Sequence, residues 1–269
     1  MSTRGIGSQL LDLLFPPRCQ VCESFCADPL CETCLESIEF ITERLCPSCG
    51  TVLRDEPPES LPGALCADCR VGRVVSGVRC AGLHCGALRD AIIKYKFHGR
   101  TQLAPIFAGM LGEVVKREVD PREGPGLPLD TCEALVPVPL HPKRRRWRGF
   151  DQAKVLCAAL AEELKMPMCD DAIERVRHTQ PQTEVSGASR RSNVRGAFEA
   201  RKPWRLEGRS FILVDDVFTT GATLDECALV LKKAGAAAVY GLTVSRAAPR
   251  WHPAAFGIGD SATGDDGHV

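Results

Sequence analysis

The order of apolar and polar positions divides residues 74–244 into alternating short strands and amphipathic helices. Short continuous apolar runs predict strands at 74–81, 134–138, 211–214 and 238–244. Apolar residues that recur every three or four positions predict helices at 87–97, 103–119, 153–164 and 223–234. Continuous apolar runs are typical of strands that are covered on both faces, and the longer period is typical of helices with one buried face.

This alternation predicts an α/β domain with a mostly parallel sheet flanked by helices. Residues 120–130 are rich in Pro and Gly, so we expect a surface loop there. From Trp251 onward the chain is rich in Gly, Ala and Asp, and this tail is predicted to be disordered.

The most informative segment reads FILVDDVFTTGAT and runs from Phe211 to Thr223. Ligands of parallel sheets bind at the carboxyl ends of the strands, where Asp215 and Asp216 are expected to accept hydrogen bonds from two vicinal hydroxyls. Small and polar residues follow that can wrap an anion: Thr219, Thr220, Gly221, Ala222 and Thr223. Gly221 allows close approach of the backbone, and the next helix directs its positive dipole end to the same place.

The alternative is that the two carboxylates only end a strand and that Thr220 or Thr223 caps a helix without any ligand. The fixed order of strand, acid pair, small-residue loop and helix favours a sugar phosphate. The segment resembles the phosphoribosyl pyrophosphate (PRPP) loop of type I phosphoribosyltransferases. That resemblance implies that Asp215 and Asp216 hold the ribose 2′ and 3′ hydroxyls, and that residues 219–223 bind the 5′-phosphate.

A second basic feature follows the strand predicted at 134–138. It consists of five cations: Lys143, Arg144, Arg145, Arg146 and Arg148. Because they come after a strand, we expect them near the carboxyl edge of the sheet, where guanidinium groups can bind a departing pyrophosphate. A solvated basic turn and a nucleic-acid patch are the alternatives.

A further basic stretch lies between Arg175 and Arg209, with nine cations and three glutamates. Its middle, residues 179–193, is nearly free of large apolar side chains and cannot form a core of its own. It is either a disordered surface loop or a lid that orders over bound ligand. The candidate lid residues are Gln182, Arg190, Arg191 and Asn193.

The cysteines point to a second module. The 269 residues exceed one average domain, and nine of the 15 cysteines precede residue 70. Eight of them form four C-x2-C pairs: Cys19/Cys22, Cys31/Cys34, Cys46/Cys49 and Cys66/Cys69. An odd total, no secretory signal and this spacing favour zinc in a reducing cytosol over disulfides. No apolar run approaches the length of a membrane span.

Tetrahedral zinc takes four thiolates, so the pairs are expected to combine two by two. Sequential pairing gives two structural zinc sites, of which the second has a usual zinc-ribbon interval. An interleaved cross-brace is an alternative, as is one empty or redox-active site. Cys80 and Cys85 are either further ligands or small core residues. We expect removal of zinc to unfold residues 19–69 and to leave the sheet domain folded.

Charge separates the same two modules. Residues 19–69 carry ten acidic and two basic side chains, and the remaining residues carry 24 acidic and 32 basic ones. Phosphates would repel so acidic a segment, so the cysteine-rich part is interpreted as a scaffold or protein-docking module. Anion binding is assigned to the basic part.

Taken together, the motifs resemble the ComF/GntX family, whose members join a cysteine-rich ribbon to a phosphoribosyltransferase-like domain. The matching segments are Leu14 to Cys22, Lys94 to Arg100, Val136 to Pro139 with Arg148 to Gln152, Gln180 to Gln182 with Arg191 to Phe198, and the PRPP loop. We therefore expect a double zinc ribbon at 14–72, a phosphoribosyltransferase-like domain at 73–248 and the tail at 251–269.

The resemblance implies a cytoplasmic protein that binds PRPP with Mg²⁺ and transfers a phosphoribosyl group. Its alternative implication is a non-catalytic accessory protein of competence, which handles single-stranded DNA during uptake together with other competence proteins. Asp151 stands where the family usually has Asn, and could either weaken pyrophosphate binding or help hold Mg²⁺. Purine-type transferases usually have an acidic residue at the position of Thr219, so the acceptor is not identified by the sequence.

Overall fold

The computed structural model describes residues 16–42, 45–53, 65–120, 122, 126–177, 192, 194–202, 206–248 and 252–253. The lid candidates Gln182, Arg190, Arg191 and Asn193 lie outside these residues. The tail expected from Trp251 lies outside them too, apart from residues 252–253. Within the described ranges, none of the helices is both long and apolar enough to cross a membrane.

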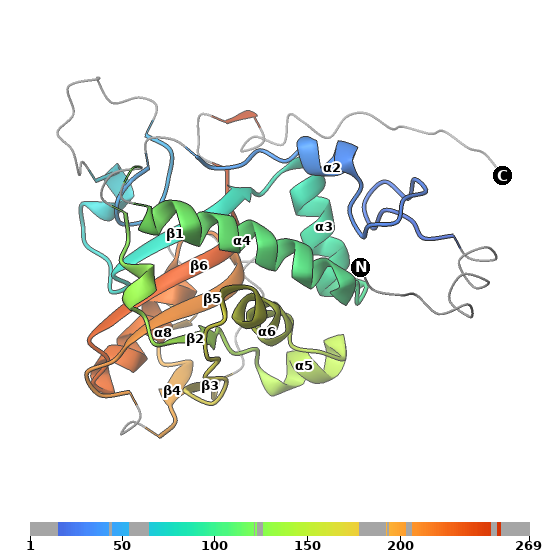
Figure 1. Ribbon diagram of the computed structural model, residues 1–269. Helices are drawn as coiled ribbons and strands as arrows, with labels where there is room; N and C mark the ends of the chain where they lie inside the picture. The colour runs from blue at the N-terminus through green and yellow to red at the C-terminus, as the bar shows by residue number, and fades with distance from the viewer. Residues whose placement is uncertain are drawn as a thin grey trace.

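A four-stranded, fully parallel sheet forms the centre of the molecule, as the alternation of strands and helices predicted (Figure 1). Its strand order is β1-β6-β5-β2. The bounds are Gly77–Leu83 for β1, Ala134–Pro137 for β2, Ser210–Phe218 for β5 and Ala238–Arg246 for β6. Because all four strands run the same way, their carboxyl ends meet at one edge of the sheet.

Strand β5 shows why its sequence is a continuous apolar run. Phe211 and Leu213 pack into the core on one face of the sheet, and Ile212 and Val214 into the core on the other face. Successive side chains of a strand point to opposite faces, so a strand that is covered on both sides needs apolar residues at every position.

Helices cover both faces of the sheet. The helices α3 (Gly86–Phe97), α4 (Ala104–Val119) and α6 (Gln152–Leu164) pack on one face, and α8 (Ala222–Lys233) packs on the other. Figure 1 shows α4 running across β1 and β6, with α6 beside it. Each of these helices begins and ends within one or two residues of the predicted positions, because its apolar face is also its buried face.

The structure adds elements that the sequence pattern did not predict. The basic run is a short helix, α5 (Pro142–Arg148), and not a turn. His141 caps its start by accepting a hydrogen bond from Lys143 N, and Gly149 ends it in a left-handed conformation. A two-stranded antiparallel sheet pairs β3 (Ile173–Arg175) with β4 (Phe198–Ala200). Three-residue strands are too short to show a period of their own.

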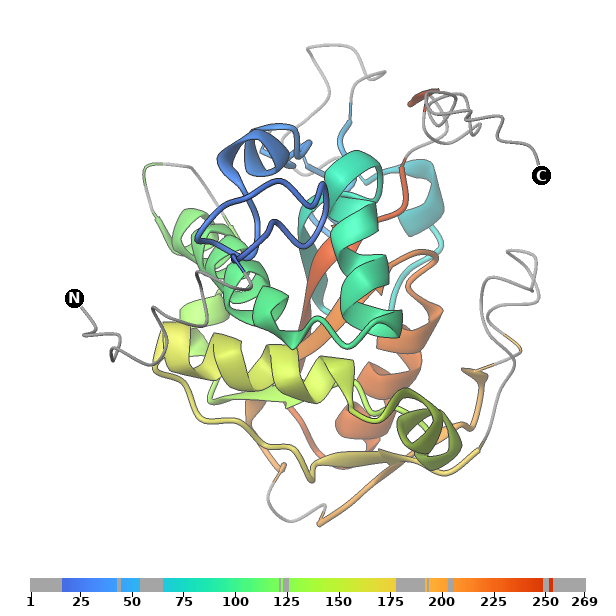
Figure 2. The same cartoon turned by 90° about the vertical axis from the view of Figure 1, so that its right-hand side faces the viewer.

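The cysteine-rich segment packs directly on the sheet domain. Its first half includes the short helix α2 (Glu32–Glu36) and lies beside α3, where Lys94 Nζ donates to the Val21 carbonyl at 3.0 Å (Figure 2). Its second half lies along β1, where Val78 N donates to the Ser48 carbonyl at 2.9 Å. Buried cysteines of the two halves belong to the two cores that also cover the sheet. The ribbon is therefore continuous with the main core, which argues against the expectation that it unfolds separately.

Candidate functional site

A cavity of about 900 Å³ opens at the carboxyl edge of the parallel sheet. Side chains reach it from the ends of β1, β2 and β5, from helices α3 and α5, and from the start of α8. Its size lies within the range of small-molecule sites, and this edge is where parallel sheets bind their ligands.

Two carboxylates lie at the base of this cavity. Asp215 and Asp216 belong to β5 itself, which continues to Phe218 and does not stop before the acid pair as expected. Asp216 is only 3% exposed, and its Oδ1 pairs with Lys96 Nζ of α3 at 2.7 Å. Its Oδ2 is buried and accepts no hydrogen bond from the residues that the structure describes. A buried carboxylate oxygen without a donor is costly, so a ligand hydroxyl or cation that reached it would be bound favourably.

Asp215 has a different environment from its neighbour. Its Oδ1 accepts a hydrogen bond from Asp216 N at 2.9 Å. Burial, together with the negative charge of Asp216, raises the pKa of Asp215 to about 7. The acid pair thus combines one carboxylate in an ion pair with a second carboxyl that titrates near neutral pH.

His84, at the end of β1, forms another part of the cavity wall. Its Nδ1 lies 2.9 Å from Ser245 Oγ of β6. Burial, together with the nearby positive charge of Lys96, lowers the pKa of His84 to about 4. The imidazole is therefore neutral at physiological pH and adds no positive charge to the cavity.

The loop from Thr219 to Thr223 joins β5 to α8, and Gly221 is the N-cap of that helix. Gly221 has a φ of +80°, and a Cβ there would lie 2.3 Å from Arg73 Nη1 and 2.8 Å from the Phe218 ring. Only glycine fits this position, because of both the left-handed conformation and the lack of space. Thr219 and Thr223 line the cavity, while Thr220, Gly221 and Ala222 are not among the residues that line it.

Helix α5 presents its cations to two sides. Lys143, Arg144 and Arg148 line the cavity, whereas Arg145 and Arg146 are exposed and do not. Arg148 Nη1 donates to Gln152 Oε1 at 2.5 Å, and its buried Nε makes no hydrogen bond to the described residues. Arg148 and Asp216 both line the cavity, and a guanidinium N–H and a carboxylate oxygen that no described residue satisfies suit a ligand with both anionic groups and hydroxyls.

Asp151 lies next to this helix without lining the cavity. It is the N-cap of α6, and its Oδ1 accepts a hydrogen bond from Lys154 N at 3.2 Å. Asp and Asn are about equally good at this capping position, so an Asp here serves the same structural purpose as an Asn.

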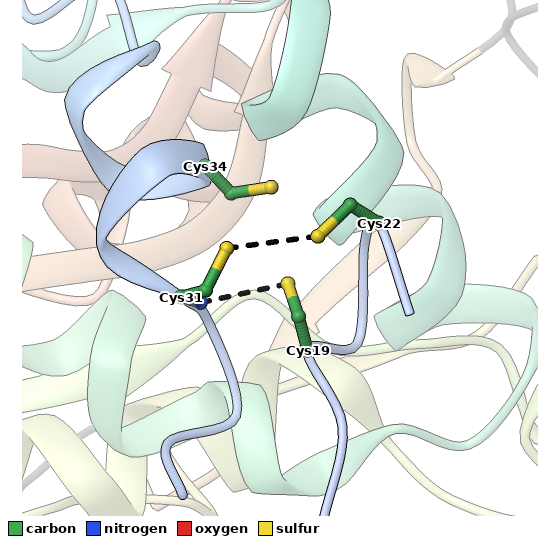
Figure 3. A group of neighbouring side chains, drawn as sticks. All are labelled: Cys19, Cys22, Cys31 and Cys34. Carbon is green, nitrogen blue, oxygen red and sulfur yellow. Dashed lines mark hydrogen bonds between the residues drawn. The ribbon is translucent and has the colours of Figure 1, made fainter. Parts of the chain in front are cut away.

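The eight paired cysteines form two clusters. One contains Cys19, Cys22, Cys31 and Cys34, and the other contains Cys46, Cys49, Cys66 and Cys69. All four sulfurs of a cluster lie within 4.8 Å of one another, and Cys22 Sγ and Cys31 Sγ are 3.6 Å apart (Figure 3). A tetrahedral zinc with metal–sulfur bonds of about 2.3 Å places its sulfurs about 3.8 Å apart. The clusters therefore fit two structural zinc sites with sequential pairing.

The cross-brace alternative does not match this grouping, and neither Cys80 nor Cys85 belongs to either cluster. Cys80 is buried in β1 and accepts a hydrogen bond from Thr243 Oγ1, so it is a core residue. Cys85 donates to the Glu39 carboxylate.

Comparison with known proteins agrees with the two parts seen in the structure. Residues 10–70 match a model of the double zinc ribbon domain, and residues 151–251 match a model of the phosphoribosyl transferase domain. The chain is 32% identical to the DNA utilization protein YhgH of Salmonella typhi over 215 residues, which cover 78% of this chain and 87% of that protein. It is 27% identical to the competence protein ComFC of Bacillus subtilis, over 81% of this chain and 85% of the relative.

The chain belongs to the ComF family. It is also similar to a solved structure of glutamine PRPP amidotransferase from B. subtilis, with 18% identity over 56% of this chain and 30% of that one, and a TM-score of 0.35. The expected fold, a parallel sheet of phosphoribosyltransferase type with an N-terminal double zinc ribbon, is confirmed.

The structure of this ComF-family protein also brings residues to the cavity that sequence reasoning missed. They are His84, Arg89, Lys96, Phe97 and Arg175. Lys96 and Phe97 lie in the family-matching segment 94–100, which was the one available signal for them. Arg175 was noted only as the first cation of a basic stretch, and His84 and Arg89 carried no local signal, because they come from the end of β1 and from α3.

Proposed function

We propose that this ComF-family protein binds PRPP in the cavity and transfers its phosphoribosyl group to a nucleophilic acceptor. The bond between ribose C1 and the pyrophosphate oxygen breaks, and pyrophosphate leaves with the electron pair. The acceptor supplies the pair for the new bond to C1 and loses a proton to solvent. The observation that carries this proposal is the buried Oδ2 of Asp216, which accepts no hydrogen bond from the described residues, in a cavity that three cations of α5 also line.

Each group of the donor has a matching part of the site. Asp215 and Asp216 accept hydrogen bonds from the ribose 2′ and 3′ hydroxyls, and Lys96 fixes the orientation of Asp216. The loop 219–223 binds the 5′-phosphate at the start of α8, where backbone N–H groups and the helix dipole favour an anion. Lys143, Arg144 and Arg148 bind the pyrophosphate and stabilise the negative charge that develops as it leaves.

The acid pair also fits Mg²⁺. This ion prefers oxygen ligands, and Asp216 Oδ2 is a buried carboxylate oxygen that no described residue satisfies. Asp215 and Asp216 would hold it, and when bound it would neutralise part of the charge of the pyrophosphate. The remaining contribution of the protein is to position the sugar and to keep its cations in place before the reaction begins.

The test is calorimetric titration of the full-length, zinc-loaded protein with PRPP, with and without Mg²⁺. We expect binding in the micromolar range, on the order of 8 kcal/mol, that depends on Mg²⁺. Asp216→Asn should abolish it, because the amide can neither pair with Lys96 as an anion nor accept a charge-assisted hydrogen bond. Asp130→Asn, at an exposed position outside the cavity, is the matched control. Equal affinity in wild type and Asp216→Asn would refute the assignment of the site.

A second candidate function is the handling of single-stranded DNA, and one observation favours it. Phe97 and Trp147 are 54% and 74% exposed, and their ring centroids lie 6.2 Å apart at the cavity, beside the cations of α5. Exposed aromatic rings next to cations are what sequence-tolerant binding of single strands uses. Of the other aromatic residues considered from the sequence, Phe198 is buried, Phe150 is partly buried against the core, and Trp204 lies outside the described residues.

This second function predicts an affinity for an oligonucleotide that falls steeply with salt. Replacement of Arg144, Arg145 and Arg146 by Ala should flatten the salt dependence, and Trp147→Ala should weaken binding by about 1 to 3 kcal/mol per stacked base. An affinity that does not change with salt would exclude this function. In this second function, the acidic ribbon is the surface proposed to dock other competence proteins, because complementary charge favours basic partners.

A further inference from the structure

We propose that the metal site of Cys46, Cys49, Cys66 and Cys69 is part of the phosphate-binding apparatus, and that Arg73 is the positioning residue that joins the two. The state of this one metal site would then set the affinity of the loop 219–223 for a phosphate group. The inference rests on the proposed function in that PRPP is taken as the ligand of the loop.

Arg73 is in contact with both sites at once. Its Nε donates a hydrogen bond to Cys69 Sγ at 3.3 Å, on the side of the metal site. Its Nη1 and Nη2 both donate to the Thr220 carbonyl at 3.1 Å, 147 residues further along the chain. The side chain is only 9% exposed, so these contacts are not shared with bulk water. A planar guanidinium with donors on both edges can hold two groups in a fixed relative orientation.

The same arginine fixes the start of α8. Its Nη1 donates to Asp225 Oδ2 at 2.9 Å, and Asp225 Oδ1 accepts hydrogen bonds from Val74 N at 3.1 Å and Val75 N at 3.2 Å. Asp225 thereby ties the segment that leaves the ribbon to the first turn of the helix behind the loop. Gly221 leaves the space that the guanidinium occupies, since a Cβ there would lie 2.3 Å from Arg73 Nη1.

A second cysteine of the same cluster, Cys49, also contacts an arginine. Arg246, at the end of β6, donates from Nη1 to the Cys49 carbonyl at 2.8 Å, and the same atom lies 3.8 Å from Cys49 Sγ. The guanidinium carbons of Arg73 and Arg246 lie 5.3 and 5.2 Å from the centroid of the Phe218 ring, just before the loop. Two cysteines of one metal site thus hold the two arginines that pack against Phe218.

The other cluster provides an internal comparison. Its segment contacts α3, where Lys94 Nζ donates to the Val21 carbonyl at 3.0 Å and to Glu23 Oε1 at 3.2 Å. Arg18 belongs to that segment, where its Nη1 donates to the Glu23 carbonyl and its guanidinium lies over the Phe25 ring. The chain therefore contains two similar metal sites, only one of which has an arginine that reaches the loop among the described contacts.

The physical link is the acceptor strength of the sulfur. A metal-bound cysteine is a thiolate and accepts the hydrogen bond of Arg73, whereas a protonated or oxidised sulfur is a weaker acceptor. Loss of the metal would release one end of Arg73 and loosen its hold on Thr220. Because coupling between two sites is reciprocal, a phosphate in the loop must also change the metal site.

The test uses the full chain loaded with ¹¹³Cd in place of zinc and followed by ¹¹³Cd NMR. Each cluster gives its own resonance, and Cys66→His and Cys31→His assign the two, since histidine also binds metals of this type. Titration with PRPP is expected to shift the resonance of the Cys46–Cys69 cluster and to leave the other in place. Arg73→Lys should remove that shift and weaken PRPP binding about tenfold, a common size for coupling between sites. Arg18→Lys is the matched control and should keep both.

If PRPP binds while the resonance of the Cys46–Cys69 cluster stays unchanged, or if Arg73→Lys binds PRPP as tightly as wild type, the inference is wrong. If the wild type does not bind PRPP, the proposed function is wrong. The role of Arg73 in joining the Cys46–Cys69 cluster to the loop 219–223 is then tested in the protein without ligand. In that case, amide exchange of residues 218–225 in the metal-loaded protein should be faster in Arg73→Lys than in wild type, but not in Arg18→Lys. Equal exchange in all of them would overturn the link as well.

Discussion

At the scale of single residues, the two aspartates of β5 show how neighbours in sequence can differ in chemistry. Asp216 forms an ion pair with Lys96 and is almost fully buried. Asp215 accepts the local hydrogen bond of Asp216 N, and its pKa is raised to about 7. The ion pair of Asp216 depends on a lysine of helix α3, which the motif itself does not contain.

Asp215 gives a prediction for the pH dependence of PRPP binding. Its pKa is raised from 3.8 to about 7, so below pH 7 the carboxyl is mostly neutral and accepts hydrogen bonds from hydroxyls less strongly. We expect the affinity to fall about tenfold more in wild type than in Asp215→Asn between pH 8 and pH 6, as measured by titration calorimetry. The comparison with Asp215→Asn removes the titration of PRPP itself, and parallel pH profiles would contradict the prediction.

The raised pKa of Asp215 affects the stability of the fold in the opposite direction to its effect on PRPP binding. Without ligand, the folded protein keeps a proton on Asp215 that the unfolded chain has lost between about pH 4 and about pH 7. The contribution of this carboxyl therefore lowers the free energy of unfolding as the pH rises through that window. A carboxyl group whose pKa is shifted at a cost to the stability of the fold is typical of a ligand-binding site.

At the scale of elements, helix α5 decides which cations of the basic run take part in the site. The run has five cations in six positions, and nothing in the order of its residues distinguishes them. In the helix, Arg144 and Arg148 lie four positions apart and line the cavity together with Lys143, whereas Arg145 and Arg146 are exposed outside it. The sequence predicted the place of the run, and its helical conformation selected the residues.

This selection predicts unequal effects of substitution within α5. Arg144→Ala with Arg148→Ala should weaken binding of pyrophosphate by at least about tenfold, because two charge-assisted contacts are lost. Arg145→Ala with Arg146→Ala removes the same net charge outside the cavity and should change the affinity by less than about twofold at physiological salt. Both double variants are measured by titration with inorganic pyrophosphate. Equal losses would indicate that the basic run acts only through its overall charge.

At the scale of the whole molecule, the ribbon and the sheet domain form one packed unit. Cys19, Leu30 and Cys34 belong to the core between the sheet and helices α3, α4 and α6, and Cys46, Cys49 and Cys69 belong to the core on the side of α8. The charge difference between the two parts is therefore a property of their surfaces and does not mark a separation of their cores.

The continuous core predicts a cooperative response to loss of zinc. Structural zinc contributes about 10 to 16 kcal/mol in zinc-finger peptides, as much as or more than the total stability of a typical domain. We expect chelation to unfold the ribbon and the parallel sheet in one transition, with loss of helical circular dichroism and of amide protection in β5 at the same chelator concentration. Protection retained in β5 after the ribbon amides have exchanged would show two independent units instead.

The features that depend on local order could be read from the amino-acid sequence alone. The apolar runs fixed the strands of the parallel sheet because both faces of that sheet are covered, and the C-x2-C spacing fixed the cysteine pairs because a tight turn brings two thiolates to one metal. The Gly221 loop was recognisable because its order of strand, acid pair and helix is contiguous. Gln182, Arg190, Arg191 and Asn193, predicted as lid residues, lie outside the described residues and stay a prediction.

Which distant residues meet at that loop depends on tertiary packing. Lys96 reaches Asp216 from α3, and Arg73 joins Cys69 to Thr220 across 147 residues. No local pattern records such contacts, because they arise when helices and ribbon pack on opposite faces of one sheet and direct their polar ends to the same edge. Local propensities therefore fixed the elements of this protein, and the packing of the two cores fixed its site.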